Sequence, residues 1–117
     1  MRISESEMEL MEIMWADGTE LSCSELMEQL KEDWKQSTIQ TFLKRLCDKG
    51  ALSVRKEGKN NFYTPEITRG QYKGEKTAEF LNEMHGGSLE SLLDSIFRYR
   101  KPNEDEITHL STWIKNI

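Results

Sequence analysis

Polar and basic side chains share one face of the segment 37–49, and their types match the chemistry of reading DNA bases. A glutamine pairs with adenine, an arginine or lysine pairs with guanine, and a threonine methyl group contacts the thymine methyl group. Hydroxyl groups near a helix N-terminus suit phosphate oxygens. The candidate DNA-binding residues of this segment are Ser37, Thr38, Gln40, Thr41, Lys44 and Arg45. Taken alone, the same pattern is also typical of an ordinary solvated helix face.

A basic hairpin follows this segment and is the second candidate for DNA contact. Strand-like residues at 52–54 and 62–64 flank a turn that contains Gly and Asn, which is typical of a β-hairpin. In a winged domain, the charged side chains of such a hairpin reach phosphate groups or the neighbouring minor groove. The candidate residues are Arg55, Lys56, Lys59, Asn60 and Asn61, with Tyr63 as a phosphate contact or a packing residue. Charged residues also shield an exposed edge strand, so this second interpretation stays open.

The charge distribution separates these two segments from the rest of the chain. The protein has a formal net charge of −5, yet residues 34–64 hold seven basic and two acidic side chains. Residues 1–33 hold two basic and ten acidic side chains, and residues 65–117 hold seven and nine. A basic helix and hairpin inside an acidic chain is the electrostatic pattern expected of a DNA-binding surface.

Three helices are expected to position these residues. Capping boxes at Ser4–Glu7 and Ser22–Glu25 predict the starts of two helices, the second running to about Asp33. Ser37 or Thr38 is expected to cap the third helix, whose apolar residues recur at i, i+3, i+4 and i+7 and turn inward. Three helices followed by a two-stranded hairpin is the order of a winged helix-turn-helix domain.

The predicted organisation is a winged helix-turn-helix DNA-binding domain over residues 1–66 and a helical dimerisation region over residues 67–117. Apolar residues recur at helical spacing in three later segments, the last opened by a capping box at Asn103–Glu106. Short amphipathic helices need a surface to bury against, and a second copy of the chain is the simplest one. The expected dimerisation residues are Tyr72, Phe80, Leu81, Leu89, Leu92, Leu93, Ile96, Phe97, Leu110, Trp113 and Ile114. The predicted fold class is mainly α with a small β-hairpin.

The composition favours a binding protein over an enzyme. The chain has no Gly-rich phosphate loop, no nucleophile motif, and no His, Cys and carboxylate set at metal-ligand spacing. We therefore expect no catalytic residue, no cofactor and no metal site. No apolar run approaches the roughly 20 residues of a membrane span, so we expect a cytoplasmic protein with no membrane partner. The alternatives to DNA binding are a winged-helix protein-interaction module and a ligand- or metal-responsive regulator.

Several motifs resemble the penicillinase and methicillin-resistance repressors, a family of bacterial winged-helix transcriptional repressors with a copper-responsive branch. Residues 3–15 resemble the opening helix of that family, and residues 38–52 resemble its recognition helix and following strand. The segment from Phe62 to Pro65 matches the end of its wing, and Gly86 to Leu89 matches the glycine break in its dimerisation region. The resemblance spans essentially the whole chain.

The resemblance implies a homodimeric repressor that binds a palindromic operator in double-stranded DNA. In the family, a membrane sensor lifts repression by triggering cleavage in the helix after the glycine break, so an inducing protease or sensor is a further expected partner. The Asn-Phe cleavage pair of the family is replaced here by Ser95 and Ile96. The copper-responsive branch uses a cysteine-rich tail, and this chain has no cysteine after Cys47. The sequence therefore predicts a repressor without predicting its inducing signal.

Overall fold

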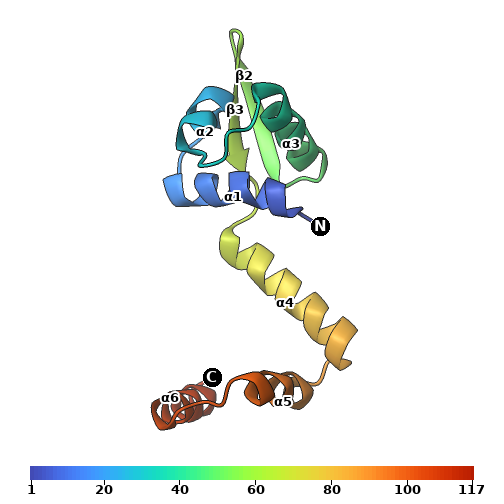
Figure 1. The fold of residues 1–117 in the computed structure, drawn as a ribbon, viewed down its shortest axis with the longest axis vertical. Helices are drawn as coiled ribbons and strands as arrows, with labels where there is room; N and C mark the ends of the chain where they lie inside the picture. The colour runs from blue at the N-terminus through green and yellow to red at the C-terminus, as the bar shows by residue number, and fades with distance from the viewer. The chain divides into compact units, whose positions relative to one another are not determined.

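The computed structural model describes residues 1–117 as six helices and a small antiparallel sheet (Figure 1). The helices are α1 (Glu5–Asp17), α2 (Cys23–Gln29), α3 (Gln36–Asp48), α4 (Arg69–His85), α5 (Leu89–Tyr99) and α6 (Glu104–Lys115), and the strands are β1 (Leu21–Ser22), β2 (Leu52–Glu57) and β3 (Asn60–Pro65). The chain divides into two compact units, Met1–Lys73 and Gly74–Ile117. None of the helices has the length and apolar character needed to cross a membrane. The predicted fold class is confirmed.

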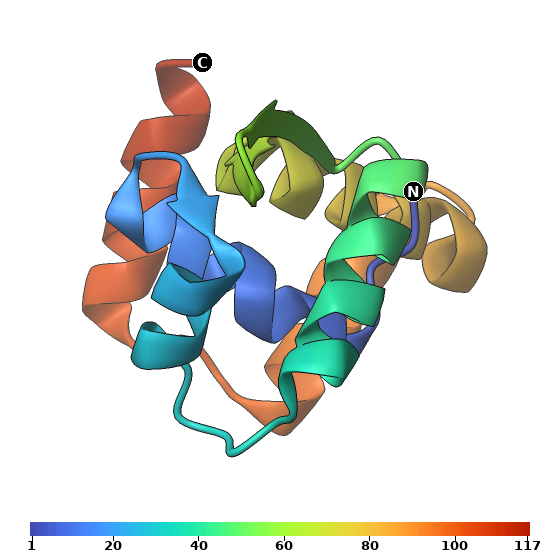
Figure 2. The ribbon, with the colours of Figure 1, turned by 90° about the horizontal axis from the view of Figure 1, so that it is seen from above.

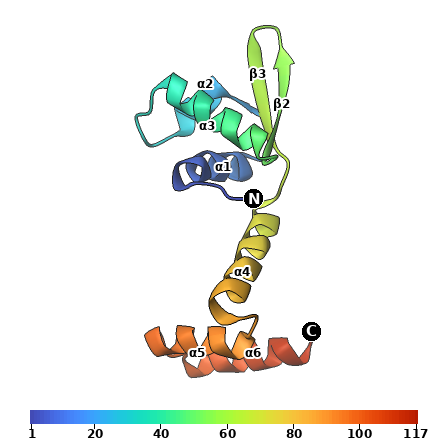
Figure 3. The same cartoon turned by 90° about the vertical axis from the view of Figure 1, so that its right-hand side faces the viewer.

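The first unit is held together by an apolar core that α1, α2, α3 and the sheet share. The largest core side chains without exposed surface are Leu10, Met11, Met14, Leu26, Ile39, Leu43 and Leu46. The last three lie on one face of α3, at the i, i+4 and i+7 spacing of an amphipathic helix. Figure 2 shows α2 and α3 on either side of α1, and Figure 3 shows the β2–β3 hairpin extending beyond these helices. The core therefore fixes α3 beside the base of the hairpin.

The sheet contains a third, very short strand that was not predicted. β1 pairs with β3, so that Leu21 lies opposite Tyr63 and Ser22 opposite Phe62, and the strand order is β1-β3-β2. A two-residue strand has no alternating pattern to detect, and the expected two-stranded hairpin is therefore corrected to a three-stranded sheet. Gly58 begins the turn between β2 and β3 with a φ of 61°, as the first central position of a type II′ turn requires.

α2 is shorter than the sequence predicts. Its capping box is confirmed, because the Ser22 hydroxyl accepts a hydrogen bond from the Glu25 backbone N–H and the Glu25 carboxylate accepts one from Ser22. The helix ends at Gln29 rather than near Asp33. Leu30 adopts an extended backbone and packs its side chain against the core. The next three residues, Lys31, Glu32 and Asp33, have no apolar side chain to bury, so packing does not extend the helix through them.

The start of α3 also differs from the expectation. Lys35 is the N-cap, and no side chain caps the first turn. The expected caps Ser37 and Thr38 lie inside the helix, because the carbonyl oxygen of Lys35 already accepts hydrogen bonds from the N–H groups of Thr38 (3.0 Å) and Ile39 (3.1 Å). The first hydrogen bonds of the helix are therefore accepted by the backbone carbonyl group of Lys35, and the helix begins before the predicted side-chain caps.

The buried carboxylate of Glu7 links α1 to the end of α3. Glu7 is 1% exposed, completes the expected capping box with Ser4, and forms an ion pair with Lys49. Burial raises the pKa of Glu7, but hydrogen bonds from Lys49 and Ser4 outweigh that effect and hold the pKa below its usual value of 4.5. The ionised carboxylate therefore stabilises the first unit.

We expect Glu7→Gln to lower the free energy of unfolding by about 1–2 kcal/mol at pH 7. Glutamine keeps the capping acceptor and removes the negative partner of Lys49. Because folding lowers the pKa of Glu7, its contribution is present above the usual value of 4.5 and is lost as the pH falls through the folded-state pKa. Urea unfolding should therefore show a smaller difference at about pH 3 than at pH 7. The exposed neighbour Glu9→Gln is the control, and an equal loss for Glu7→Gln at both pH values would contradict the ionic role.

The helices of the second unit form no buried core within a single chain, and polar contacts join α5 to α6. No residue of α4, α5 or α6 is buried. Asn103 and Glu106 form the predicted capping box at the start of α6. Arg100 donates two hydrogen bonds to the Glu106 carboxylate (2.9 and 2.8 Å), and these bonds, together with the backbone N–H of Asn103, lower the pKa of Glu106 to about 2. These contacts fix the connection between α5 and α6.

Candidate nucleic-acid interface

The face of α3 opposite the core carries the residues predicted to read DNA. The predicted residues that are exposed on this face are Ser37, Gln40, Thr41, Lys44 and Arg45, and Thr38 is half-buried. Phe42 lies at the edge of the apolar face and packs edge-on against Trp34, with ring centroids 5.3 Å apart. The helix therefore presents a polar and basic surface that the core holds in place.

Part of this surface lines two clefts that α3 shares with the hairpin. A polar cleft of about 120 Å³ lies between Gln36 and Gln40 of α3 and residues 59–61 of the hairpin. A neighbouring cleft of about 460 Å³ lies between Gln40 and Lys44 of α3 and Tyr63 of β3. The structure thus brings together predicted residues from α3 and from the hairpin at one surface.

Four residues that line the polar cleft were not among the predicted DNA-binding residues: Ser22, Cys23, Ser24 and Gln36. Gln36 was excluded because the helix was expected to begin at Ser37 or Thr38. The i, i+4 repeat of Gln36, Gln40 and Lys44 is the signal that identifies it, since these positions share a helix face. Ser24 belongs to α2, and only tertiary packing brings it to the cleft.

A second row of predicted residues, Ser37, Thr41 and Arg45, follows α3 at steps of about one turn and lines neither cleft. The hydroxyl group of Thr41 donates to the carbonyl oxygen of Ser37 at 2.9 Å. Arg45 takes part in none of the ion pairs of the chain. Its guanidinium group is therefore available to an external partner.

The β2–β3 hairpin, which we call the wing, presents its cations in two ways. Lys56 and Lys59 form no ion pair, whereas Arg55 is held by two carboxylates. Nη2 and Nε of Arg55 donate to Glu20 at 2.6 and 3.3 Å, and Nη1 donates to Glu57 at 2.7 Å. The hydrogen bonds from Arg55 lower the pKa of Glu20. Arg55 therefore differs from the other two cations, although all three were predicted to contact DNA.

Tyr63 belongs to the core of the first unit. It is 7% exposed and lies opposite Val54 of β2 and Leu21 of β1. Burial raises the pKa of its hydroxyl group, and a hydrogen bond with Asn61 opposes that shift. Its ring therefore packs in the core, and part of the side chain borders the cleft beside Gln40.

Most residues predicted for a dimer contact leave apolar surface exposed on the second unit. Those with large exposed side chains are Phe80, Leu89, Leu93, Ile96, Leu110, Trp113 and Ile114, while Leu81, Leu92 and Phe97 are half-buried. The α5 members recur at the spacing of one helix face. These side chains therefore form an exposed apolar stripe along α5 in the single chain.

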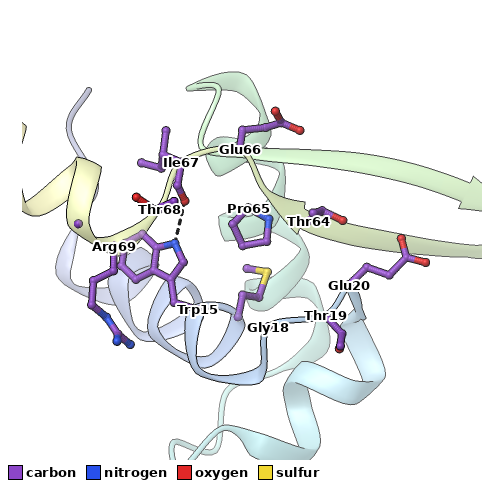
Figure 4. Close-up of a pocket in the computed structure, with 12 residues that line it drawn as sticks. Trp15, Gly18, Thr19, Glu20, Thr64, Pro65, Glu66, Ile67, Thr68 and Arg69 are labelled. Atoms are coloured by element: carbon purple, nitrogen blue, oxygen red, sulfur yellow. Dashed lines mark hydrogen bonds between the residues drawn. The ribbon is translucent and has the colours of Figure 1, made fainter.

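Tyr72, also predicted for the dimer contact, lies in the first unit. Its ring centroid is 6.3 Å from that of Trp15, and its hydroxyl oxygen accepts a hydrogen bond from the N–H of Ile3 (3.3 Å). Trp15 also borders a pocket of about 530 Å³ at the end of α1, where its Nε1 donates to the carbonyl oxygen of Ile67 at 2.9 Å (Figure 4). No predicted DNA-binding residue lines this pocket. These contacts instead fasten the start of α4 to α1.

The two cysteines border the clefts beside α3 as free thiols. Cys23 lines the polar cleft and Cys47 lines its neighbour. Burial raises the pKa of both thiols, so both are protonated at neutral pH. No group of three or more His, Cys, Asp or Glu side chains is arranged to hold a metal ion.

Comparison with known proteins points to one family. The family model described as penicillinase repressor matches residues 3–116. A penicillinase repressor of Bacillus licheniformis is 34% identical over 111 residues, which cover 93% of this chain and 86% of that protein. The methicillin resistance regulatory protein MecI of Staphylococcus aureus (strain N315) is 29% identical over 110 residues, which cover 92% and 89%. These matches confirm the resemblance found in the sequence.

A solved structure shares the fold of the first unit. The solution structure of the monomeric form of Bacillus licheniformis BlaI, in complex with the blaP half-operator, matches with a TM-score of 0.52 and 38% sequence identity. The match covers 62% of this chain and 89% of that one. The three-helix unit with its small sheet is therefore similar to a domain that, in BlaI, was solved on DNA.

Proposed function

Because the chain belongs to the penicillinase repressor family of DNA-binding transcriptional repressors, which are not enzymes, we propose that it represses transcription as a homodimer on a palindromic operator. In this proposal α3 enters the major groove and the wing lies along the DNA backbone. The observation that carries it is the joint surface of Gln40 and Lys44 with the wing, within the basic segment 34–64. Such a surface offers groups for base edges and for phosphates together.

The exposed face of α3 supplies the base contacts in this proposal. Gln40 suits adenine and Arg45 suits guanine, because amide and guanidinium groups form bidentate hydrogen bonds with those bases. Ser37 and Lys44 suit phosphate oxygens, and Thr41 offers a methyl group for thymine. The first turn of α3 has no side-chain cap, which leaves backbone N–H groups for a phosphate.

The exposed apolar surface of α5 and α6 supports the homodimer. The relative BlaI was solved as a monomeric form on a half-operator, so one winged unit of that protein occupies half of the site. Two copies of the present chain joined through their second units fill a palindrome. Their two α3 helices then lie in successive major grooves, about 34 Å apart.

An inducing protease or sensor is a further partner in the proposal, although the Asn-Phe pair that is cleaved in the family is replaced in this chain. Ser95 and Ile96, at the position of the cleavage pair in the family, lie inside α5. A protease reaches their peptide bond only after local unfolding of this helix. Ile96 also belongs to the exposed apolar face, so cleavage there divides the proposed dimer contact.

Fluorescence anisotropy with DNA from upstream of this protein's own gene tests the proposal. We expect tight binding that weakens steeply with salt, exceeds binding to scrambled DNA, and requires two chains per site. Equal affinity for both DNAs would contradict operator recognition. Saturation at one chain per full site would contradict the homodimer but would agree with the proposed DNA-binding surface.

A further inference from the structure

We propose that Arg55 is a positioning residue that clamps the wing to the segment before β1, and that it is not a phosphate ligand. The inference rests on the proposed function, because it concerns how the wing meets DNA. The proposal gives different roles to three cations that were all predicted from the sequence to contact DNA. Lys56 and Lys59 contact phosphate, and Arg55 holds the strand that carries Lys56.

The clamp consists of Glu20, Arg55, Glu57 and Phe62. Three contacts of 2.6, 3.3 and 2.7 Å join the guanidinium group of Arg55 to the two carboxylates. Its central carbon lies 4.9 Å from the centroid of the Phe62 ring, and Phe62 is the residue opposite Arg55 in β3. Since β3 lies between β1 and β2, the contact from Arg55 to Glu20 spans the whole sheet.

The N–H groups of Arg55 that would bind a phosphate already donate to the carboxylates of Glu20 and Glu57. Glu20 accepts two hydrogen bonds from Arg55, and this is the bidentate arrangement that arginine also uses for phosphate. A phosphate therefore binds Arg55 only by displacing a carboxylate. The clamp holds one guanidinium and two carboxylates, so its net charge of −1 repels the DNA backbone.

The clamp also lies on the face of the wing that points away from α3 and from the proposed DNA-binding surface. Val54 lines the cleft shared with α3. Successive residues of a strand point to opposite faces, so Arg55 lies on the face away from that cleft and Lys56 lies on the cleft side. A two-stranded hairpin alone is marginally stable, and the clamp ties the middle of β2 to the segment before β1. A wing held in advance loses less conformational freedom when DNA binds.

The test is a charge-balanced double variant, Glu20→Gln with Arg55→Gln, compared with the wild type on its promoter DNA over a series of salt concentrations. We expect the affinity to fall about two- to fivefold at every salt concentration, because exposed ion pairs contribute little individually. The slope of log affinity against log salt should keep its wild-type value. That slope counts neutralised phosphates, and the clamp neutralises none.

A second charge-balanced variant, Lys59→Gln with Glu66→Gln, is the matched control. Its slope should become shallower by about 0.9 per protomer, because Lys59 contacts phosphate in this assignment. Arg55→Lys provides a further measurement in a variant that keeps the positive charge. Lysine lacks the planar fork, so we expect Arg55→Lys to weaken binding as much as the double variant does. Circular dichroism verifies that each variant is folded.

Two results would overturn the positioning role of Arg55. One is a slope that becomes shallower by about 0.9 per protomer in the Glu20→Gln, Arg55→Gln variant, which would make Arg55 a phosphate ligand. The other is wild-type affinity in that variant, which would leave the clamp without a function in binding. If the wild-type protein itself binds promoter and scrambled DNA equally, the proposed function fails and this inference fails with it.

Discussion

Leu93→Asp is expected to produce a monomer whose affinity for a full operator is lower on the order of a hundredfold. Leu93 lies in α5 and is 42% exposed in the single chain, within the apolar face that a second copy would cover. An aspartate at this position would bring an unpaired charge into the contact. Two linked winged units bind a palindrome far more tightly than one unit does, because the second binding event becomes intramolecular.

Analytical ultracentrifugation and anisotropy on full and half operators measure the two parts of this prediction. The variant should sediment as a monomer and should bind a single half-site as the wild type does, because the first unit is unchanged. Ser91→Asp, which adds the same charge on the polar side of α5, should remain dimeric. If the Leu93→Asp variant is dimeric and keeps full operator affinity, α5 is not part of the dimer contact.

Local signals in the sequence identified most of the helices. The capping boxes at Ser4–Glu7, Ser22–Glu25 and Asn103–Glu106 are confirmed, because each depends only on residues three apart in the chain. The inward face of α3 was equally predictable, since burial follows the 3.6-residue period. Elements defined by short-range periodicity are therefore the ones that sequence predicts well.

The features that escaped prediction depend on contacts between distant residues. β1 has two residues and exists only because β3 offers it a partner. The ion pairs of Arg55 show the same limit, because Glu20 lies 35 residues away and no local pattern connects the two. Ser24 reaches the polar cleft only through the packing of α2. A count of basic residues predicts where DNA binds, but the partners of each cation decide which of them are available.

Arg45→Ala is expected to weaken binding to the natural operator by about 1–3 kcal/mol and to relax the preference at one base pair of each half-site. Arg45 is exposed on α3 and has no ion-pair partner to release before it binds DNA. A guanidinium group that pairs bidentately with guanine contributes discrimination, whereas one that touches only phosphate strengthens binding to every sequence equally. The two roles therefore differ in specificity as well as in affinity.

Anisotropy against the operator, a set of single-base-pair variants and random DNA separates these roles. Loss of affinity for the operator with little change on random DNA assigns Arg45 to a base, and the operator variant that is no longer discriminated identifies which base. An equal loss on all DNAs makes it a phosphate contact. Arg2→Ala, which removes the same charge outside α3, should leave the preference intact. If Arg45→Ala binds operator and random DNA with wild-type affinities, Arg45 is not part of the interface, and the cleft-side residues Gln40 and Lys44 become the principal candidates for sequence reading.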